Sequence, residues 1–458
     1  MTRQDQDNAR LAAHARLSAF LAALSRTGGQ PPQGEGPFDL RGVRAGRGDL
    51  APHVGAGDPP PWLDEAGGLN LAEAGLAGAD LIEADLSGAN LARASLAGVL
   101  GRSARFAGAR IEEADFAEAD LSGADFSGIV GGQARFADAM VEDATFADAA
   151  MRFAKLPRAL LDGADFSRAD LWGADFAGAD ADYSVFRGAR LDEADLSDTN
   201  LTHADFEGAS LKKAKLVNAR LRGANLTGLK LDGADLSGAD LSDTNLVRLD
   251  LATCNLRHVR FAGAWLTGTR FRVEQLGGAV GEEVTGEYEA AKASYLALEQ
   301  NLRSIGSHEE SRWAYKRGRR MGRRHAFVQA RAAWRRRDAR AAVSHGYRWV
   351  SDRFVEWLCD YGESLSRLVR AFAVVIALFA VLYGATGGLL LEEDGLRPTY
   401  NVLDLVSYSA LNMMTANPPE IGIKPTGRVT NLLVGVQGAA GIILMGLFGF
   451  VLGNRLRR

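Results

Sequence analysis

The chain has very few cysteines for its length. Cys254 and Cys359 are the only two among 458 residues, and they lie far apart and form no CxxC pair. This argues against a disulfide framework and against a cysteine zinc site, and a reducing cytoplasm is the simplest home for both thiols. A signal peptide is also missing from the pattern, because Met1 to Arg10 is polar and the apolar stretch that follows is broken by His14 and Arg16.

Residue sets that could carry out catalysis are missing as well. His203 and His258 are isolated, and the many aspartates follow a repeating frame instead of clustering. We find no nucleophile–base pair, no phosphate-binding loop and no cluster with metal-ligand spacing. We therefore expect a protein that is not an enzyme, with no catalytic residue, no metal and no cofactor.

The formal net charge of −4 hides a strong asymmetry along the chain. Residues 71–276 hold thirty-two acidic and twenty-two basic side chains, whereas residues 281–370 hold twelve acidic and eighteen basic ones. Such a split indicates separate domains with different surroundings.

A five-residue repeat runs from Leu71 to Leu276. Stepping by five from Leu71 to Leu276 covers forty-two positions, and thirty-nine of them hold a bulky apolar residue; the exceptions are Gly101, Gly131 and Ala181. The residue two places before each of these is nearly always Ala, and the one between is often Asp or Asn. A period of five fits neither a helix nor a flat strand, but it fits a solenoid that turns a corner every five residues.

The physical interpretation of this repeat is a narrow coil with one large and one small inward side chain per side. The small one must be Ala-sized because the interior leaves no further room. Four sides per coil give about ten coils, and at ~4.8 Å per coil they make a rod of roughly 50 Å. Each coil buries its core only against its neighbours, so both ends need caps.

The pattern A(D/N)LXX resembles the pentapeptide-repeat family, which implies a right-handed quadrilateral β-helix over residues 66–280. An Ala-rich helix with chance spacing is the alternative, but Gly is too frequent here for a long helix. Some members of that family are acidic rods that mimic DNA, and the acidic excess permits such a role. An acidic surface is ordinary for a soluble repeat, however, so we expect a scaffold or sensor arm, with a cytoplasmic protein as a possible partner.

The segments that flank the rod differ from it. Residues 1–65 hold a predicted helix from Asp7 to Leu24 and a Gly- and Pro-rich stretch from Gly28 to Pro61, within which we expect Phe38 to Leu50 to cap the first coil. Residues 281–350 predict an all-α linker with two helices, and the second is strongly basic. Arg335, Arg336 and Arg337 belong to this basic stretch, and we expect them to contact anionic membrane lipid. Binding of nucleic acid is the rival interpretation and is not expected, because an apolar span follows so closely.

Two long uncharged runs predict a membrane domain over residues 351–458. Residues 371–391 and 432–453 are each about as long as the ~20 apolar residues that cross a bilayer. A buried core helix is the alternative interpretation of such a run. Phe354, Trp357, Leu358 and Tyr361 precede the first run and indicate an interfacial helix. Basic residues gather before the first run and after the second, which predicts a multi-pass protein of the inner membrane with both termini in the cytoplasm.

The loop between the two runs predicts a re-entrant segment. Val402 to Met414 is apolar but too short to span, and irregular sequence follows it. Irregular backbone at membrane depth is tolerated only where it is buried in protein or lines water. Span, half-helix, irregular loop and span is the plan of a pore-loop channel.

The chain from about Tyr288 onward resembles pentapeptide-repeat proteins with a two-span module of the potassium-channel type. The matching segments are Asp360-Tyr361-Gly362-Glu363, Ser407-Tyr408-Ser409, Pro425-Thr426-Gly427-Arg428 and Gly441. The resemblance implies a homotetramer. The filter itself departs from the family, because Thr415-Ala416-Asn417-Pro418-Pro419-Glu420 stands where T-x-G-Y-G-D is expected.

That departure changes the predicted chemistry of the pore. Pro418 and Pro419 fix φ and remove two N–H groups, so the usual column of inward carbonyls is not expected. In a tetramer Asn417 would offer a ring of amides and Glu420 a ring of carboxylates, which favours cations without selecting potassium.

The second run also carries gate and hinge candidates, Gly438, Gly441, Phe448 and Leu452. Close helix packing is the alternative for the glycines, and lipid contact is the alternative for the larger side chains. From all these features we expect an ion channel with a cytoplasmic repeat domain. The alternatives are a non-conducting, membrane-anchored scaffold that binds a protein, and an anchored DNA mimic.

Overall fold

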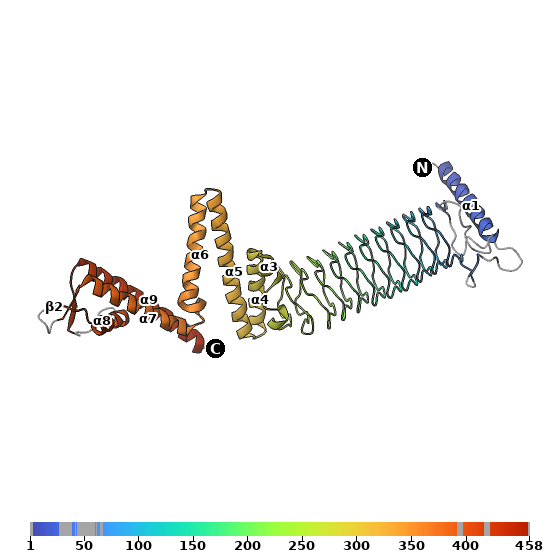
Figure 1. Cartoon of the computed structure of the whole chain (residues 1–458). Helices are drawn as coiled ribbons and strands as arrows, with labels where there is room; N and C mark the ends of the chain where they lie inside the picture. The colour runs from blue at the N-terminus through green and yellow to red at the C-terminus, as the bar shows by residue number, and fades with distance from the viewer. Residues whose placement is uncertain are drawn as a thin grey trace. The chain divides into compact units, whose positions relative to one another are not determined.

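The computed structural model describes residues 3–26, 39–41, 43, 60, 62–64, 67–391, 397–415 and 422–456. The chain divides into two compact units, Met1–Met321 and Gly322–Arg458. The division falls inside one long helix, α5 (His308–Arg335). The first unit holds the repeats and the second holds the apolar helices (Figure 1).

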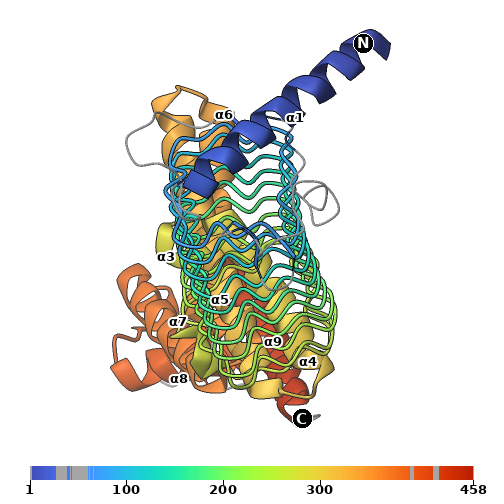
Figure 2. The same ribbon diagram turned by 90° about the vertical axis from the view of Figure 1, so that its right-hand side faces the viewer.

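The repeats form a solenoid with twenty residues per coil. Isolated parallel bridges join each side to the residue twenty positions further on, from Asn70↔Asn90 to Asp250↔Arg270. The backbone bonds are short and regular: the Leu71 N–H, for example, donates to the Asn90 carbonyl at 2.7 Å. Figure 2 looks nearly along the stack and shows the coils behind one another. The predicted β-helix of four five-residue sides per coil is therefore confirmed.

The large inward side chains form two columns of stacked rings in the middle of the rod. Phe106 and Phe126 stack with ring centroids 4.7 Å apart, and Phe116 and Phe136 stack at 4.9 Å. Between the columns the rings meet edge to face, as Phe106 and Phe116 do at 5.8 Å. The stacking distance equals the spacing of neighbouring strands, so each ring covers the ring of the next coil.

The small inward position is occupied by a polar side chain in some coils, and that side chain then donates a hydrogen bond to a backbone carbonyl. Ser184, Thr199 and Thr269 are buried there, and each hydroxyl donates to the carbonyl twenty-three residues earlier, at 2.7, 2.9 and 2.7 Å. The thiol of Cys254 does the same towards the Leu231 carbonyl at 3.1 Å. Burial raises the pKa of Cys254 to about 12, so this thiol is a packing group and not a nucleophile.

The corners of the coils explain the many glycines. The residue two places after most large inward residues has a left-handed backbone, as at Gly78 (φ 68°) and Gly88 (φ 70°). Glycine adopts this region without a steric cost. Glu73 and Glu83 occupy equivalent corners at φ 61° and 57°, so glycine is favoured there but not obligatory.

The series of parallel bridges between coils is interrupted at one place. Leu229 and Leu249 take the small position on adjacent coils, where most coils have Ala. The bridges Asn225↔Asn245 and Lys230↔Asp250 are missing from an otherwise continuous series across these described residues. A leucine exceeds the Ala-sized space, so the two coils pair less closely here.

Both ends of the rod are capped. At the start, α1 (Arg3–Arg26) buries Leu17, Phe20, Leu21 and Leu24 in the same core as Leu40 and Trp62. The Leu40 N–H donates to the Asp80 carbonyl at 2.8 Å, within the segment expected to cover the first coil. The end of the rod is closed by η2 (Val273–Leu276), α3 (Gly281–Thr285) and α4 (Tyr288–Ser304).

The second unit consists of helices and one small sheet. Its elements after α5 are α6 (Ala339–Cys359), η3 (Asp360–Gly362), α7 (Leu365–Thr386), β1 (Leu389–Leu391), β2 (Arg397–Pro398), α8 (Val402–Thr415), β3 (Ile423–Pro425) and α9 (Arg428–Leu456). The sheet has the order β2-β1-β3 with antiparallel pairs, such as Leu390↔Pro398 and Leu390↔Lys424. Helices α7, α8 and α9 pack against one another.

Two predicted boundaries need correction. The first span was expected at residues 371–391, but α7 begins at Leu365 and ends at Thr386. Gly387 ends the helix with φ 58°, and residues 389–391 form β1 instead of a last helical turn. The domain boundary expected between residues 350 and 351 falls in the middle of α6. The second span, expected at 432–453, lies inside α9.

Candidate functional site

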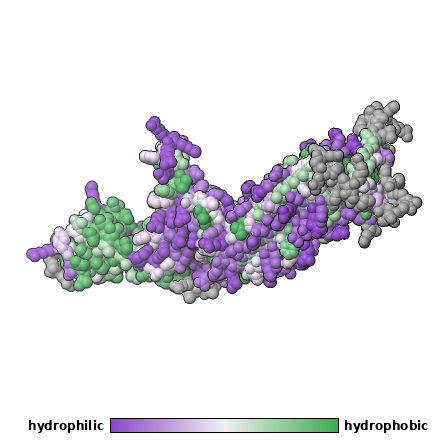
Figure 3. Space-filling view, turned by 45° about the vertical axis from the view of Figure 1, so that its right-hand side comes forward, coloured by the Kyte–Doolittle hydropathy of each residue, from purple (hydrophilic) through white to green (hydrophobic). Residues whose placement is uncertain are grey.

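Two helices of the second unit are long and apolar enough to cross a membrane. They are α7 (Leu365–Thr386) and the part of α9 up to Gly453, with mean hydropathies of 2.3 and 2.0. Only 28% and 22% of their most apolar stretches are buried, so most of each helix has no protein around it. The core helix of a soluble domain is mostly buried, and Figure 3 shows the hydrophobic residues gathered on this unit while the rod surface is largely hydrophilic.

The short helix α8 packs against both long helices. It has 14 residues, and at 1.5 Å per residue it is about 21 Å long, too short for a ~30 Å hydrocarbon core. Its buried residues are Leu405, Tyr408, Ser409, Asn412 and Met413. The helix agrees with the apolar segment predicted from Val402 to Met414.

The predicted filter begins where α8 ends. Thr415 is the last residue of that helix, and Ala416, Asn417, Pro418, Pro419 and Glu420 lie outside the described residues. On the far side of this loop, β3 pairs with β1 and α9 follows at once. The described chain therefore enters and leaves the loop beside the same pair of long helices.

The four gate and hinge candidates on α9 differ in how deeply they are buried. Gly438 and Gly441 are buried against the rest of the unit, and Phe448 and Leu452 are half-buried. Phe448 packs on a cluster that includes Leu368 and Leu444. A Cβ on Gly441 would lie 2.0 Å from the Met413 carbonyl oxygen, so this glycine permits the close contact of α9 with α8.

A buried polar network links α7, α8 and α9, and the sequence patterns did not predict it. Tyr383, Ser409, Asn412 and Gln437 are fully buried. The Tyr383 hydroxyl donates to Gln437 Oε1 at 2.7 Å, and Asn412 Nδ2 donates to the same oxygen at 3.0 Å. Gln437 Nε2 donates to Ser409 Oγ at 2.6 Å. The available signal was that Gln437 is the one strongly polar residue of an apolar run, which needs buried partners.

The other end of α7 is tied to the linker helices by charge. Glu356 is buried on α6 and forms ion pairs with Arg323 of α5 and with Arg353, the latter at 3.0 Å. The guanidinium of Arg367, in the first turn of α7, donates to the Glu356 carbonyl at 2.9 Å. These bonds join three helices at the start of the first apolar helix.

The turn between α6 and α7 contains the Asp360-Tyr361-Gly362 segment. All three residues have a left-handed backbone, with φ of 50°, 62° and 89°. Burial and a hydrogen bond to Asp352 raise the pKa of Tyr361 above its ordinary value, so the phenol stays protonated as a donor. A Cβ on Gly362 would lie 3.7 Å from the Phe450 ring, so the turn also touches the last part of α9.

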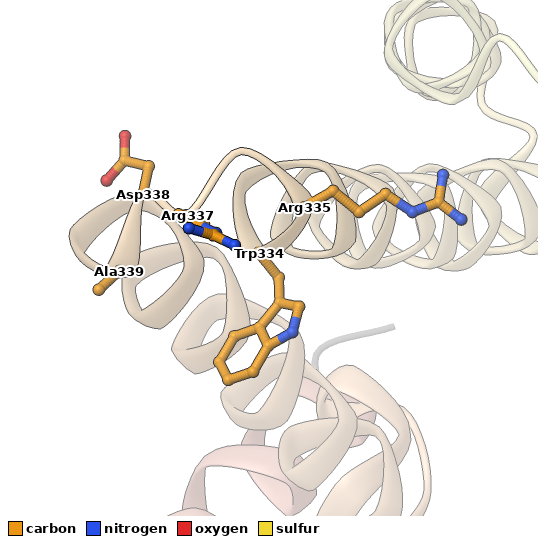
Figure 4. Close-up of a pocket in the computed structure, with 5 residues that line it drawn as sticks. All are labelled: Trp334, Arg335, Arg337, Asp338 and Ala339. Carbon is orange, nitrogen blue, oxygen red and sulfur yellow. The ribbon is translucent and has the colours of Figure 1, made fainter.

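The predicted lipid-contacting arginines lie at the α5–α6 turn. Arg335 and Arg337 line a hollow of about 490 Å³ together with Trp334, Asp338 and Ala339 (Figure 4). Trp334 is 79% exposed. Arg336 neighbours them on the same turn.

Helix α6 carries an exposed apolar stripe that runs from this turn towards α7. Its large exposed members are Val343, Tyr347, Val350, Phe354 and Trp357. Their spacing of four, three, four and three residues keeps them on one narrow face of the helix. Arg340, Arg348 and Arg353 are interspersed along the same helix.

Comparison with known proteins concerns the repeats. The family model for pentapeptide repeats matches eight copies, at residues 70–100, 102–130, 144–180, 159–198, 173–208, 189–228, 204–243 and 234–272. A search of curated proteins found no significant match.

Solved structures with similarity to the chain include three repeat proteins. HetL of the cyanobacterium Nostoc sp. strain PCC 7120, described as involved in heterocyst differentiation regulation, is 30% identical, with 43% of this chain and 87% of HetL covered and a TM-score of 0.22. QnrB1, described as a plasmid-mediated fluoroquinolone resistance protein, is 26% identical over 42% of this chain and 95% of its own, with a TM-score of 0.25. The pentapeptide repeat protein alr5209 of Nostoc is 41% identical over 19% of this chain and 69% of its own, with a TM-score of 0.18.

Proposed function

Since the chain is a pentapeptide-repeat protein whose second unit holds two helices apolar enough to cross a membrane, we propose that it is a membrane-bound pore-loop channel that conducts cations. The observation that carries this proposal is α8, a helix too short to span that packs against both long apolar helices. A re-entrant half-helix in that position is the arrangement that brings a loop into the membrane from one side.

The chemistry of the loop supports a wide cation pore. Asn417 offers an amide and Glu420 a carboxylate, and neither needs the glycine-rich backbone of a potassium filter. Pro418 and Pro419 lack the N–H groups that would tie such a filter to the surrounding protein. We therefore propose weak selectivity among cations, with Glu420 attracting them to the outer mouth.

The pore would form between four copies of the chain. Both long helices expose apolar side chains on their outer faces. On α7 these are Val369, Val374, Leu378 and Val381, and on α9 they are Val429, Leu432, Val436, Ile442, Ile443, Met445 and Phe450. Such faces suit contact with lipid and with neighbouring subunits.

The linker supports an inner-membrane location with both termini in the cytoplasm. The apolar stripe of α6, with arginines along the same helix, is the composition of a helix that lies in the headgroup layer of an anionic membrane. Arg335, Arg336 and Arg337 would bind lipid phosphate at the α5–α6 turn. Basic residues concentrate on this side of the spans, which is the cytoplasmic side by the positive-inside rule.

The rod would then serve as a cytoplasmic sensor or assembly domain. Many of its acidic side chains pair with a base twenty residues away, as Asp138 does with Arg158 at 2.6 Å and Glu193 with Lys213 at 3.4 Å. These pairs place basic side chains among the acidic ones along the rod, whereas a DNA-like field needs a surface of one sign, so the DNA-mimic role is disfavoured.

The direct test is current across a planar bilayer that contains the purified, oriented protein. Wild type, Asn417→Ala and Glu420→Gln are compared, with Asp232→Asn on the rod surface as the matched control that also removes one carboxylate. We expect single-channel steps whose conductance or reversal potential changes in the two loop variants and not in the control. A folded, correctly oriented wild type that stays silent under ion gradients and voltage would contradict conduction.

A non-conducting scaffold is the second candidate, and one feature of the rod favours it. Tyr183 is 59% exposed and stacks on His203 with ring centroids 4.6 Å apart, although neither ring contributes to the core. Exposed stacked rings are typical of protein contact surfaces. A silent bilayer combined with capture of a defined protein partner that Tyr183→Ser abolishes would establish this role.

A further inference from the structure

In the buried polar network of the second unit, the donor and the acceptor of each hydrogen bond follow from the neighbouring groups. Asn412 Nδ2 lies 3.1 Å from the Val434 carbonyl and 3.0 Å from Gln437 Oε1, so the amide nitrogen must face both acceptors. Gln437 Oε1 also accepts from Tyr383. Gln437 Nε2 therefore donates, to the Ser409 carbonyl at 3.0 Å and to Ser409 Oγ at 2.6 Å. The Ser409 hydroxyl in turn donates to the Ile376 carbonyl at 2.8 Å.

Gln437 accepts hydrogen bonds from both α7 and α8 and also donates to α8. The amide oxygen of Gln437 accepts from Tyr383 of α7 and from Asn412 of α8. Its amide nitrogen donates to Ser409, which lies one turn before Asn412 on α8. A group that only accepts cannot replace it, because Ser409 presents a carbonyl oxygen to the same position. An apolar group would leave the Asn412 amide and the Tyr383 hydroxyl with fewer partners in a buried place, which is costly.

The network acts on the last turn of α8. Asn412 is three residues from Thr415, where the predicted filter begins, and the next residue, Met413, has its carbonyl against Gly441 of α9. Side-chain bonds at Asn412 and backbone contact at Met413 therefore hold consecutive residues of α8 against α9. A helix end held in this way has little freedom to shift or rotate.

We propose that Gln437 is a positioning residue of the pore: its amide holds the C-terminal turn of α8 in register with α7 and α9, and so sets where the filter begins. The inference rests on the proposed channel function for its consequence on current, but the geometry of α8 can be measured without current. Gln437 itself would not contact the permeating ion. The buried amide oxygen of Asn412 has no hydrogen-bond partner among the described residues, so it is free to accept one further donor at this turn.

The test uses Gln437→Glu, because a carboxyl changes between the two hydrogen-bonding patterns with pH. A protonated carboxyl both donates and accepts, as the amide does, whereas a carboxylate only accepts. Measurements at two pH values therefore compare the two hydrogen-bonding patterns at one position. The described titratable side chains around Gln437 are Tyr383 of α7 and, against its ring at 5.5 Å, Tyr408 of α8. Both are phenols, which stay neutral below about pH 8.

Two readouts are taken in proteoliposomes at about pH 5.5 and about pH 8. The first is cation flux of wild type, Gln437→Glu and Gln437→Leu. The second is the rate at which a thiol reagent labels Met414→Cys, a residue 64% exposed on the last turn of α8, combined with each Gln437 variant. Leu403→Cys, on the first turn of α8, is the matched control, and the natural Cys254 and Cys359 are buried.

The expected result is that Gln437→Glu behaves like wild type at the lower pH and loses flux by about tenfold at the higher one, which is the size of one lost buried hydrogen bond. The labelling rate at position 414 should change with pH in the same variant and stay constant at position 403. Gln437→Leu should be altered at both pH values. A Gln437→Leu protein with the same flux as wild type and the same labelling rate at position 414 would overturn the positioning role. A wild type without flux would contradict the channel function, and the labelling rates would still decide whether Gln437 positions α8.

Discussion

Gly441 of α9 faces the carbonyl oxygen of Met413 of α8 so closely that a Cβ would lie 2.0 Å from it. The same Cβ would lie 2.9 Å from the Met413 carbonyl carbon, so backbone and not a flexible side chain occupies the space. Of the two roles that sequence allows for this glycine, a hinge or a close contact, the geometry supports the close contact.

Replacing Gly441 with Ala should therefore move α8 away from α9. We expect a lower midpoint of thermal unfolding in detergent, equivalent to roughly 1–3 kcal/mol of overpacking, and altered or lost current. Gly446 and Gly449 lie on the same helix, and a Cβ at either position would meet no neighbouring element within 4 Å, so Gly446→Ala and Gly449→Ala are the matched controls. Equal effects of all three substitutions would argue for a general loss of helix flexibility instead.

Glu282 should matter more to the rod than any other acid at its end. It is fully buried, accepts the N–H groups of Phe261 and Ala262 at 2.9 Å each, and accepts the Ser294 hydroxyl at 2.6 Å. Glu282→Ala would leave two backbone donors without a partner, at about 1–3 kcal/mol each. Hydrogen exchange of a peptide that covers residues 256–266 should become much faster, while the exposed Glu274→Ala should leave it unchanged.

Asp162 should destabilise the rod at neutral pH. Burial first, and then the charges of Asp182, Asp180 and Asp143, raise the pKa of its carboxyl above the ordinary value. The folded rod therefore binds this proton more readily than the unfolded chain, and the carboxylate form opposes folding above that pKa. Asp162→Asn should raise the unfolding midpoint at pH 7, and the gain should disappear as the pH falls below about 4, where the carboxyl is protonated in both states.

Asp138 provides the opposite control for this pH dependence. The hydrogen bond from Arg158 lowers the pKa of Asp138, so its carboxylate contributes stability above the unfolded pKa and loses it as the pH falls. Asp138→Asn should therefore lower the unfolding midpoint at pH 7, and only slightly, because the pair is exposed to solvent. Thermal melts of Asp162→Asn and Asp138→Asn between pH 3 and pH 7 measure how each change in unfolding midpoint depends on pH. If both midpoints change with pH in the same direction, the opposite pKa shifts of Asp162 and Asp138 are refuted.

Glu356 should be essential to the junction between the linker and α7. Its carboxylate is buried and pairs with Arg323, whose side chain is 15% exposed, and with the exposed Arg353. Removing one side of a largely buried pair such as Glu356–Arg323 costs up to roughly 3–5 kcal/mol because it leaves an uncompensated charge. We expect Glu356→Gln to make α6 much more sensitive to limited proteolysis. Glu309→Gln, an exposed change in the first turn of α5, is the control and should have no effect.

The rod could be predicted in detail because its information is local. The large position, the small position and the five-residue step recur in every coil, and each coil packs only against its neighbours. The same logic shows where the prediction was incomplete: Leu229 and Leu249 break the size rule, and the ladder opens beside them. The carbonyl partners of Ser184, Thr199 and Thr269 also required the coil to be built, because they lie twenty-three residues away.

By itself the sequence determined the repeat solenoid, the two apolar helices and the short helix between them, since periodicity and run length are properties of neighbouring residues. Only the tertiary structure decided that α7 ends at Thr386, where Gly387 turns the chain into β1. It also decided that Tyr383 and Gln437, fifty-four residues apart, share a hydrogen bond, and that Ser409 and Asn412 join them. No pattern along the chain encodes that meeting, because it depends on how three helices pack, and a buried amide needs partners without specifying which residues supply them.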